Sequence, residues 1–236
     1  MKEFIAALES LKIPYDDHML QKFEGYMELV LEWNEKVNLT SITDRRQFRR
    51  KHYIDSLTCY GSSYIEGAQT IIDVGTGAGF PGVPLAIVYP EKEFLLMDSL
   101  NKKIKIVAEM TEKIGITNIS VFHGRAEEMG QSKKYREKFD LCLSRAVANL
   151  VVLSEYCIPL VKVGGYFAAY KTKEAAQEIN SAEKAIATLG GMIEERKSFT
   201  IDEFHLEHEI IYIKKIKSTL SKYPRKAGTP GKAPLK

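Results

Sequence analysis

The residues Ile71-Ile72-Asp73-Val74-Gly75-Thr76-Gly77-Ala78-Gly79-Phe80-Pro81-Gly82 decide the fold class of this chain. The apolar residues at the start are typical of a buried parallel strand, and an acidic residue follows close to the strand's end. Four glycines then occur in eight positions. Glycine adopts positive φ and has no Cβ, so the backbone can turn sharply and a ligand can lie directly against it. We therefore expect a ligand at this carboxyl edge of an α/β sheet.

Two kinds of ligand compete for this loop. Residues 77–82 satisfy the G-x-G-x-x-G spacing of dinucleotide-binding enzymes, which would make the chain a NAD-dependent oxidoreductase. However, Asp73 precedes the first glycine, where its charge opposes a phosphate, and Pro81 lacks the N–H that would bind one. An acid followed by G-x-G-x-G favours S-adenosylmethionine (AdoMet), whose sulfonium is positive. A turn without a ligand would usually need only one glycine.

The middle of the chain alternates strands and helices. We predict strands at 70–74, 93–98, 119–123, 139–144 and 166–170, and helices after Pro81 and at about 102–114, 149–161 and 173–189. Two more strands, at about 192–200 and 209–216, follow without a helix between them. Five β/α units that end in a hairpin predict an α/β fold whose seven-stranded sheet is mostly parallel.

The two ends of the chain differ from this middle part. Apolar residues recur at three- and four-residue steps between Asp17 and Val37, which predicts an amphipathic helix in a helical N-terminal region. We expect a helical extension at 1–62, a main domain at 63–217 and a basic tail at 218–236. The prolines and glycines of the tail predict that it stays mobile until something acidic holds it.

The composition is that of an ordinary globular protein. The chain has 236 residues, of which 44% are hydrophobic and 28% charged, enough for one α/β domain with an appendage. No apolar run approaches the roughly 18 residues of a membrane span, and the N-terminus lacks a signal-peptide core. We expect a cytoplasmic monomer without membrane contact. Cys59, Cys142 and Cys157 are too scattered for a disulfide framework or a zinc site, so we expect no metal.

Basic residues gather in two places and predict a polyanionic partner, which we expect to be a nucleic acid. They are Arg45, Arg46, Arg49, Arg50 and Lys51 in the helical extension, and Lys222, Arg225 and Lys226 in the tail. A solvated face or a solubilising tail is the alternative for each. If the tail binds RNA, its removal after Ser218 should weaken RNA binding and leave AdoMet affinity unchanged.

Polar residues at the other strand ends extend the expected site. Asp98 lies 19 residues after Gly79 and suits the ribose hydroxyls, whereas Ala126 and Glu127 follow the third strand and suit an adenine edge. Arg145 can bind the methionine carboxylate or the RNA backbone through its bidentate fork, and Lys171 offers a second positive group. The alternatives are a solvated acid for Asp98, a helix cap for Glu127 and surface salt bridges for the two cations.

The segment after the fourth strand indicates which atom is methylated. Ser144-Arg145-Ala146-Val147 stands where enzymes that methylate exocyclic amines carry an Asn-Pro-Pro-aromatic segment, and Cys142 lies inside a strand, where it cannot serve C5 methylation. A ring nitrogen such as guanine N7 has an in-plane lone pair and needs no general base. Its methylation would depend mostly on positioning.

Together these motifs resemble the RsmG (GidB) family, which makes N7-methylguanosine in 16S ribosomal RNA. The resemblance covers nearly the whole chain, is nearest to Gram-positive, Bacillus-type members, and is carried by residues 33–40, 52–57, 73–82, 144–147 and 222–230. It implies a class I AdoMet-dependent methyltransferase that is Rossmann-like, with an N-terminal helical extension. The implied reaction is methyl transfer to N7 of a guanosine in the 530 loop.

The resemblance also implies site residues. Carried onto this chain, the AdoMet site would include Gly75, Phe80, Ala126, Glu127 and Arg145, and the strand ends add Asp73, Gly77, Gly79 and Asp98. Arg145 is the expected catalytic residue, acting by positioning. Methylation of another RNA, an inactive RNA-binding module and a NAD-dependent oxidoreductase remain as alternatives.

Overall fold

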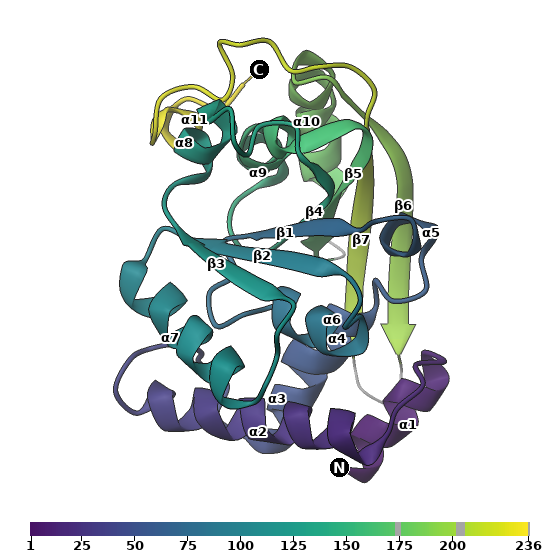
Figure 1. The fold of residues 1–236 in the computed structure, drawn as a ribbon. Coiled ribbons are helices and arrows are strands. Elements are labelled where there is room, and N and C mark those ends of the chain that lie inside the picture. The colour runs from purple at the N-terminus through teal and green to yellow at the C-terminus, as the bar shows by residue number, and fades with distance from the viewer. Residues whose placement is uncertain (173–175, 202–205, 236) are drawn as a thin grey trace.

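One mixed sheet organises the molecule (Figure 1). The computed structural model describes residues 1–172, 176–201 and 206–235. The sheet has the order β3-β2-β1-β4-β5-β7-β6, in which only the pairs formed by β7 are antiparallel. The strands are β1 (Thr70–Val74), β2 (Glu93–Asp98), β3 (Ile119–His123), β4 (Phe139–Arg145), β5 (Val161–Lys171), β6 (Gly191–Ile201) and β7 (Leu206–Lys215). The predicted mostly parallel sheet with an antiparallel hairpin is confirmed.

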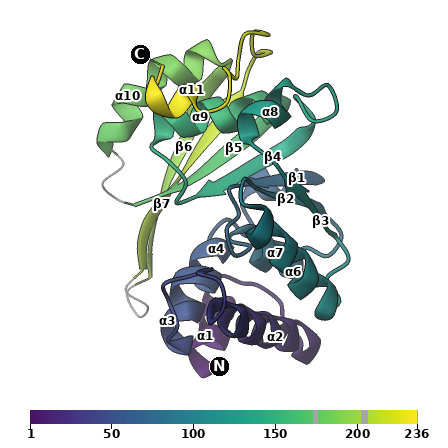
Figure 2. The same cartoon turned by 90° about the vertical axis from the view of Figure 1, so that its left-hand side faces the viewer.

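Helices cover both faces of the sheet (Figure 2). On one face lie α6 (Gly82–Val88) and α7 (Asn101–Lys113), and on the other α8 (Ala126–Gln131), α9 (Leu150–Cys157), the 3-10 turn η2 (Ile158–Leu160), α10 (Ala176–Thr188) and α11 (Thr229–Lys232). Strand side chains alternate between the faces. Thus Ile71 packs into the core on the α6 side and its neighbour Ile72 into the core on the α9 side. Both faces are buried, which explains the continuous apolar runs of the parallel strands.

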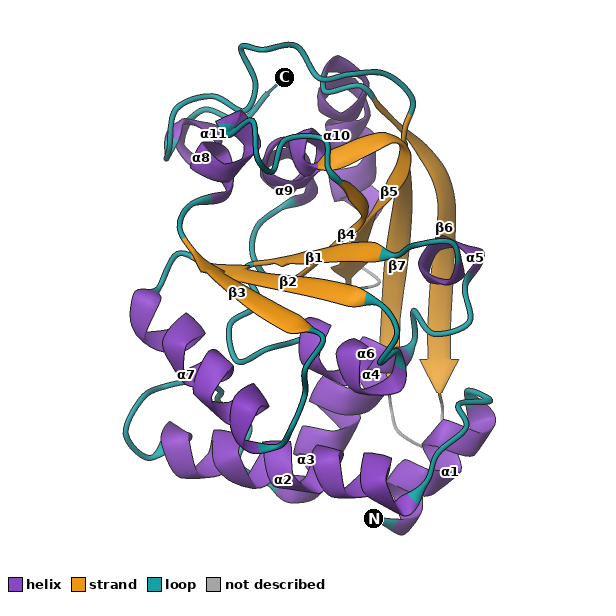
Figure 3. Ribbon diagram, in the orientation of Figure 1, coloured by secondary structure: helices purple, strands orange, loops and turns teal. Residues whose placement is uncertain are grey.

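The first of the N-terminal helices form a further layer outside α6 and α7 (Figure 3), whereas the last two pack beside α6 and against the sheet. The N-terminal helices are α1 (Lys2–Ser10), α2 (Asp17–Asn34), α3 (Arg45–Phe48), the π-helical η1 (Arg49–Ile54), α4 (Asp55–Leu57) and α5 (Ser63–Glu66). Their apolar side chains belong to the same hydrophobic core as those of α6 and α7. The Tyr26 hydroxyl donates a hydrogen bond to Ala78 O at 3.0 Å, so α2 packs directly against the glycine loop.

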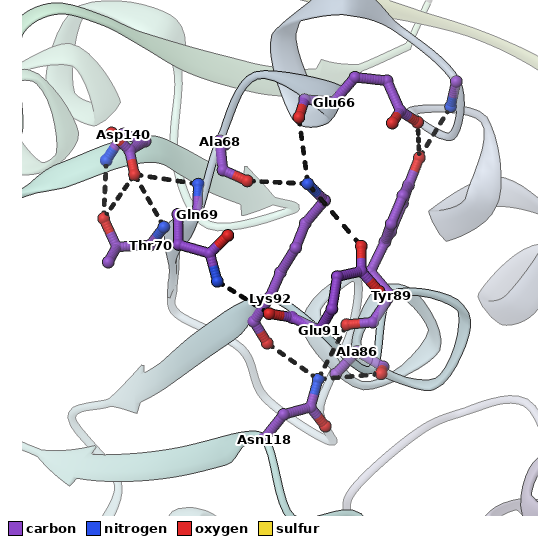
Figure 4. Close-up of polar contacts among 11 residues, drawn as sticks. Glu66, Ala68, Gln69, Thr70, Ala86, Tyr89, Glu91, Lys92, Asn118 and Asp140 are labelled. Carbon is purple, nitrogen blue, oxygen red and sulfur yellow. Dashed lines mark hydrogen bonds and ion pairs between the residues drawn. The ribbon is translucent and has the colours of Figure 1, made fainter.

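Polar contacts hold together the amino-terminal ends of the parallel strands (Figure 4). The Asp140 carboxylate accepts hydrogen bonds from the N–H groups of Gln69 and Thr70 at 3.0 and 2.8 Å. The buried ammonium of Lys92 donates to the carbonyls of Glu66 and Ala68. These contacts satisfy polar groups that would otherwise be buried unpaired. They fix the amino-terminal ends of the strands, whereas the carboxyl ends form the candidate site.

The C-terminal tail does not lie free, contrary to our expectation. The Tyr223 ring is buried in the core on the α9 side, and the Arg136 guanidinium donates hydrogen bonds to the carbonyls of Thr219 and Tyr223. The acidic group that holds the tail belongs to the chain itself, since Arg225 pairs with Glu155. None of the helices among the described residues combines the length and the apolar character needed to span a bilayer.

Candidate active site

The glycine loop after β1 is closed by the side chain of Asp73. Gly75, Gly77 and Gly79 all adopt positive φ, at 75°, 59° and 88°, which L-residues with a side chain rarely adopt. Asp73 is completely buried, and its Oδ2 accepts hydrogen bonds from Thr76 Oγ1 at 2.7 Å and from Gly82 N at 2.9 Å. Burial raises the pKa of this carboxyl to about 6. Asp73 therefore joins the two ends of the loop and does not face a ligand.

Three glycines of the loop are required by close contacts, and Gly82 is one of them because a Cβ there would collide with the Leu96 side chain. A Cβ on Gly79 would collide with the Tyr26 hydroxyl and a Cβ on Gly75 with the Val147 side chain, whereas a Cβ on Gly77 would meet no atom within 4 Å. Gly79 thus permits packing of the N-terminal helices, and Gly75 permits the approach of the segment that follows β4. Gly77 is constrained by its φ alone.

Most of the N–H groups of this loop are taken by the protein. Those of Gly75 and Thr76 donate to Met97 O, those of Gly79 and Phe80 to Thr76 O, and that of Gly77 to Asp98 Oδ2. A pyrophosphate needs such groups free to donate to it. The loop is therefore unsuited to a dinucleotide phosphate, which argues against the NAD alternative.

A cleft of about 410 Å³ opens at the carboxyl ends of β1, β2 and β3. Of the nine residues predicted to bind AdoMet, four line it, namely Gly75, Asp98, Ala126 and Glu127. The other lining residues include Ser99, Arg125, Val147, Asn149, Tyr156 and Gly231. The structure places Asp73, Gly77, Gly79, Phe80 and Arg145 outside this lining.

The two carboxylates of the cleft are held in place by backbone N–H groups. Asp98 Oδ2 accepts from Gly77 N at 3.0 Å and Oδ1 from Leu100 N at 2.8 Å. Glu127 is 4% exposed, and its Oε1 accepts from Gly228 N at 2.8 Å. Each oxygen retains a lone pair for a hydroxyl or an amino group of a ligand. Two fixed acceptors beside bare glycine backbone suit the adenosine of AdoMet.

Arg145 lies in a second cleft, of about 300 Å³, together with Asp55, Lys171, Glu178 and His208. Its guanidinium donates to Asp55 Oδ2 at 2.5 Å, to Lys51 O at 2.8 Å and to His52 Nδ1 at 3.2 Å. The side chain thus ties the end of β4 to the N-terminal helices instead of reaching into the first cleft.

Aromatic stacking supports this junction. The Phe80 ring stacks on the His52 ring with centroids 4.4 Å apart and an interplanar angle of 1°, and the Arg145 guanidinium lies 5.5 Å from the Phe80 centroid. Burial, with the nearby charges of Arg145 and Lys51, lowers the pKa of His52 to about 3, so the imidazole is neutral at pH 7. Because a guanidinium only donates, Nδ1 is the accepting nitrogen and Nε2–H donates to Thr40 Oγ1 at 2.8 Å.

A single short segment separates the two clefts. Arg145 and Ala146 line the second cleft, while Val147, Ala148 and Asn149 line the first. The Lys171 ammonium fixes this segment by donating to Ala148 O and to Glu178 Oε2, both at 2.7 Å. Lys171 therefore holds in place residues 145–149, the segment between the two clefts, which we call the partition.

The basic cluster in the helical extension is paired with acids. Arg45 contacts Glu28, Arg46 and Arg50 contact Glu3, and Arg49 contacts Glu24. Lys51, Lys222 and Lys226 are exposed, whereas Arg225 makes three side-chain hydrogen bonds and one backbone hydrogen bond to the buried carboxylate of Glu155. The positive potential expected from these arginines is thus partly cancelled by the chain's own acids.

Sequence reasoning missed most of the residues contributed by distant segments. Val147 and Asn149 follow β4 and Ser99 follows β2, so their positions at strand ends were a usable signal. Tyr156 in α9 and Gly231 in α11 carried no such signal, because the packing of α9 places the first at the cleft and the path of the tail places the second.

Comparison with known proteins agrees with this geometry. Residues 19–207 match the family model described as GidB, rRNA small subunit methyltransferase G. The chain is 46% identical over 228 residues to the ribosomal RNA small subunit methyltransferase G of Alkaliphilus metalliredigens, covering 97% of this chain and 95% of that protein. The corresponding protein of Alkaliphilus oremlandii is 48% identical with the same coverage.

Among solved structures, the O-methyltransferase of Bacillus cereus in complex with SAH has a similar fold. The TM-score is 0.57 at 18% sequence identity, and the likeness covers 88% of this chain and 95% of that one. The fold is therefore that of the class I methyltransferases, with the helical extension added at the N-terminus. On the family match and the identity to its members, the chain belongs to the rRNA small subunit methyltransferase G (GidB) family.

Proposed function

We propose that the protein transfers a methyl group from AdoMet to N7 of a guanosine in the 530 loop of 16S rRNA. The observation that carries this proposal is the pair of clefts divided by residues 145–149, beside a loop in which five N–H groups are bonded within the protein and unavailable to a phosphate. Two adjacent sites across the end of β4 suit a donor and an acceptor that must meet. The family membership supports the rRNA substrate.

The first cleft is the donor site in this proposal. Asp98 would accept from the ribose hydroxyls and Glu127 from the adenine amino group, while Gly75 leaves bare backbone for close approach. When bound, AdoMet supplies a methyl group on a positively charged sulfur that a nucleophilic nitrogen can attack. Asp73, Gly77 and Gly79 act indirectly, by holding the loop in the required shape.

The second cleft would hold the target guanine. The Watson–Crick edge of guanine presents the N1–H and N2–H₂ donors, and the carboxylates of Asp55 and Glu178 are acceptors in this cleft. A base bound by that edge turns N7, on its opposite side, away from the acids. N7 then needs no proton removed, so the catalytic contribution of the protein is alignment and the exclusion of water.

Arg145 acts in this proposal as a positioning residue. Its three hydrogen bonds and its contact with Phe80 fix the start of the partition between the clefts. A small displacement of this segment would change the approach of the nitrogen to the methyl group. The guanidinium does not itself remove or supply a proton.

The RNA surface is proposed to include the exposed lysines Lys51, Lys222 and Lys226. The arginines of the helical extension and Arg225 would contribute only if RNA phosphates replace their present carboxylate partners. We further propose that the protein acts as a cytoplasmic monomer, where rRNA is accessible, and uses no metal.

The decisive experiment combines labelled AdoMet with small ribosomal subunits that lack this methylation. Label at one guanosine in the 530 loop, detected by chemical cleavage at N7-methylguanosine, is the expected result. Label on another RNA, or at an exocyclic amine, would contradict the proposed target. Deproteinised 16S rRNA and assembled subunits, assayed side by side, identify the substrate state.

A further inference from the structure

The C-terminal tail reaches the donor cleft. Gly231, in α11, lines the same cleft as Asp98 and Glu127. The nearest atom to a Cβ built on Gly231 is the Tyr156 hydroxyl at 3.8 Å, and Tyr156 lines the cleft too. Tyr156 and Gly231, which are far apart in the sequence, therefore lie side by side in the lining of this cleft.

Two contacts determine the path of the tail across α8 and α9. The first is an anchor, in which the Arg225 side chain and its backbone N–H bind the carboxylate of Glu155, a residue only 1% exposed. The second is the hydrogen bond of 2.8 Å from Gly228 N to Glu127 Oε1. Gly228 has a φ of +80°, which lets the chain turn here and enter α11.

The second contact changes what Glu127 can do. A buried carboxylate needs donors, and the tail supplies one to Oε1, which fixes the orientation of the side chain and leaves Oε2 for a ligand. We infer that residues 227–235 are a wall of the AdoMet site, which orient Glu127 and shield the donor from water. This inference rests on the proposed function and deepens it. It also reverses our expectation that the tail serves RNA alone.

A shortened chain that ends at Lys226 tests the inference. It keeps Tyr223 in the core and the Arg225–Glu155 anchor, but it lacks the Gly228 N–H and α11. We expect the affinity for S-adenosylhomocysteine (SAH), measured by calorimetry, to weaken roughly tenfold or more, because Glu127 loses a charge-assisted hydrogen bond. The shortened chain also loses the buried Pro230 and the core contact of Leu235, so SAH binding is measured well below its melting temperature. Lys217→Ala is the matched control, since it removes an exposed positive charge that lies outside residues 227–235 and outside the cleft, and it should bind SAH normally.

A second measurement uses the full chain and keeps the inference falsifiable if the shortened one is unstable. Amide hydrogen exchange of residues 227–235 should slow when SAH is added, while exchange of residues 1–10 in α1 stays unchanged. Equal SAH affinity of the shortened and full chains, or unchanged exchange in the tail at saturating SAH, would overturn the inference. A full chain that binds no SAH would instead overturn the donor site of the proposed function.

Discussion

Asparagine in place of Asp73 should stabilise the protein at neutral pH, although it changes the acid at the centre of the donor loop. Asp73 Oδ2 accepts both hydrogen bonds, and Oδ1 has no hydrogen-bond partner. The carbonyl of an asparagine can accept the same two bonds. The variant D73N therefore keeps the two loop contacts and removes the buried charge. Its NH₂ group takes the place of Oδ1, where the O–H of a protonated Asp73 would lack a partner as well.

The size of the effect follows from the pKa. Burial, opposed by the hydrogen bonds from Thr76 and Gly82, raises the pKa of Asp73 to about 6, compared with about 3.9 for an exposed aspartate. At about 1.36 kcal/mol for each unit of pKa, ionisation of the folded protein costs about 3 kcal/mol. The pKa of Asp73 is higher in the folded state than in the unfolded state. The folded protein therefore has its full stability below about pH 4 and loses about 3 kcal/mol of it as the pH rises through about 6.

The assay is urea unfolding of the wild type and D73N between pH 4 and pH 8. The two free energies of unfolding should be nearly equal at pH 4, and D73N should be more stable by about 3 kcal/mol above pH 6. A difference that stays constant over this range would refute the reasoning. Groups that titrate identically in both proteins cancel from the comparison.

Asp140→Asn is the matched control, for which the change in the free energy of unfolding should have the opposite sign. Burial alone would raise the pKa of Asp140, but Lys162 and the hydrogen bonds from Thr70 and Gln69 outweigh it and hold the pKa at about 2. Its contribution to stability is present above the ordinary aspartate pKa and is lost as the pH falls through about 2. D140N should therefore be less stable than the wild type by the same amount at every pH from 5 to 8.

Three further variants address function. Arg145→Lys cannot reproduce the three bonds of the guanidinium, so we expect methyl transfer to slow by about a hundredfold while calorimetric SAH affinity is unchanged; a parallel loss of affinity would place Arg145 in the donor site instead. Gly77→Val puts a β-branched residue at a φ of 59°, which should cost about 1–3 kcal/mol and weaken SAH binding by roughly tenfold or more; an equal affinity in the folded variant would contradict the role of the loop. Neutralising Lys51, Lys222 and Lys226 together should reduce the slope of log K for RNA binding against log salt concentration by about 0.7–0.9 for each lysine. Filter binding at several salt concentrations measures this slope, and an unchanged slope would mean that these lysines do not contact phosphate.

The positions of the strands could be derived from the sequence. The predicted bounds 70–74, 93–98 and 119–123 are those of β1, β2 and β3, because apolar runs that end in an acid or a glycine depend only on neighbouring residues. β5 is longer than predicted, beginning at Val161 before its two glycines, because pairing with β4 extends it through a register shift. Strand ends also indicate where a cleft opens, which is why Gly75, Asp98, Ala126 and Glu127 line the candidate donor cleft; that they bind AdoMet stays a prediction.

Tertiary structure alone decided the partners of the charged residues. The sequence shows Arg145, Arg225 and the arginines of the helical extension as cations, but not the carboxylates that bind them. Glu155 is separated from Arg225 by 70 residues and Glu127 from Gly228 by 101. No periodicity or motif encodes such pairs, because they form only when the packing of α8, α9 and the tail brings distant backbone together. The glycine loop and the strand ends thus determined the kind of site, and long-range packing determined which residues complete it.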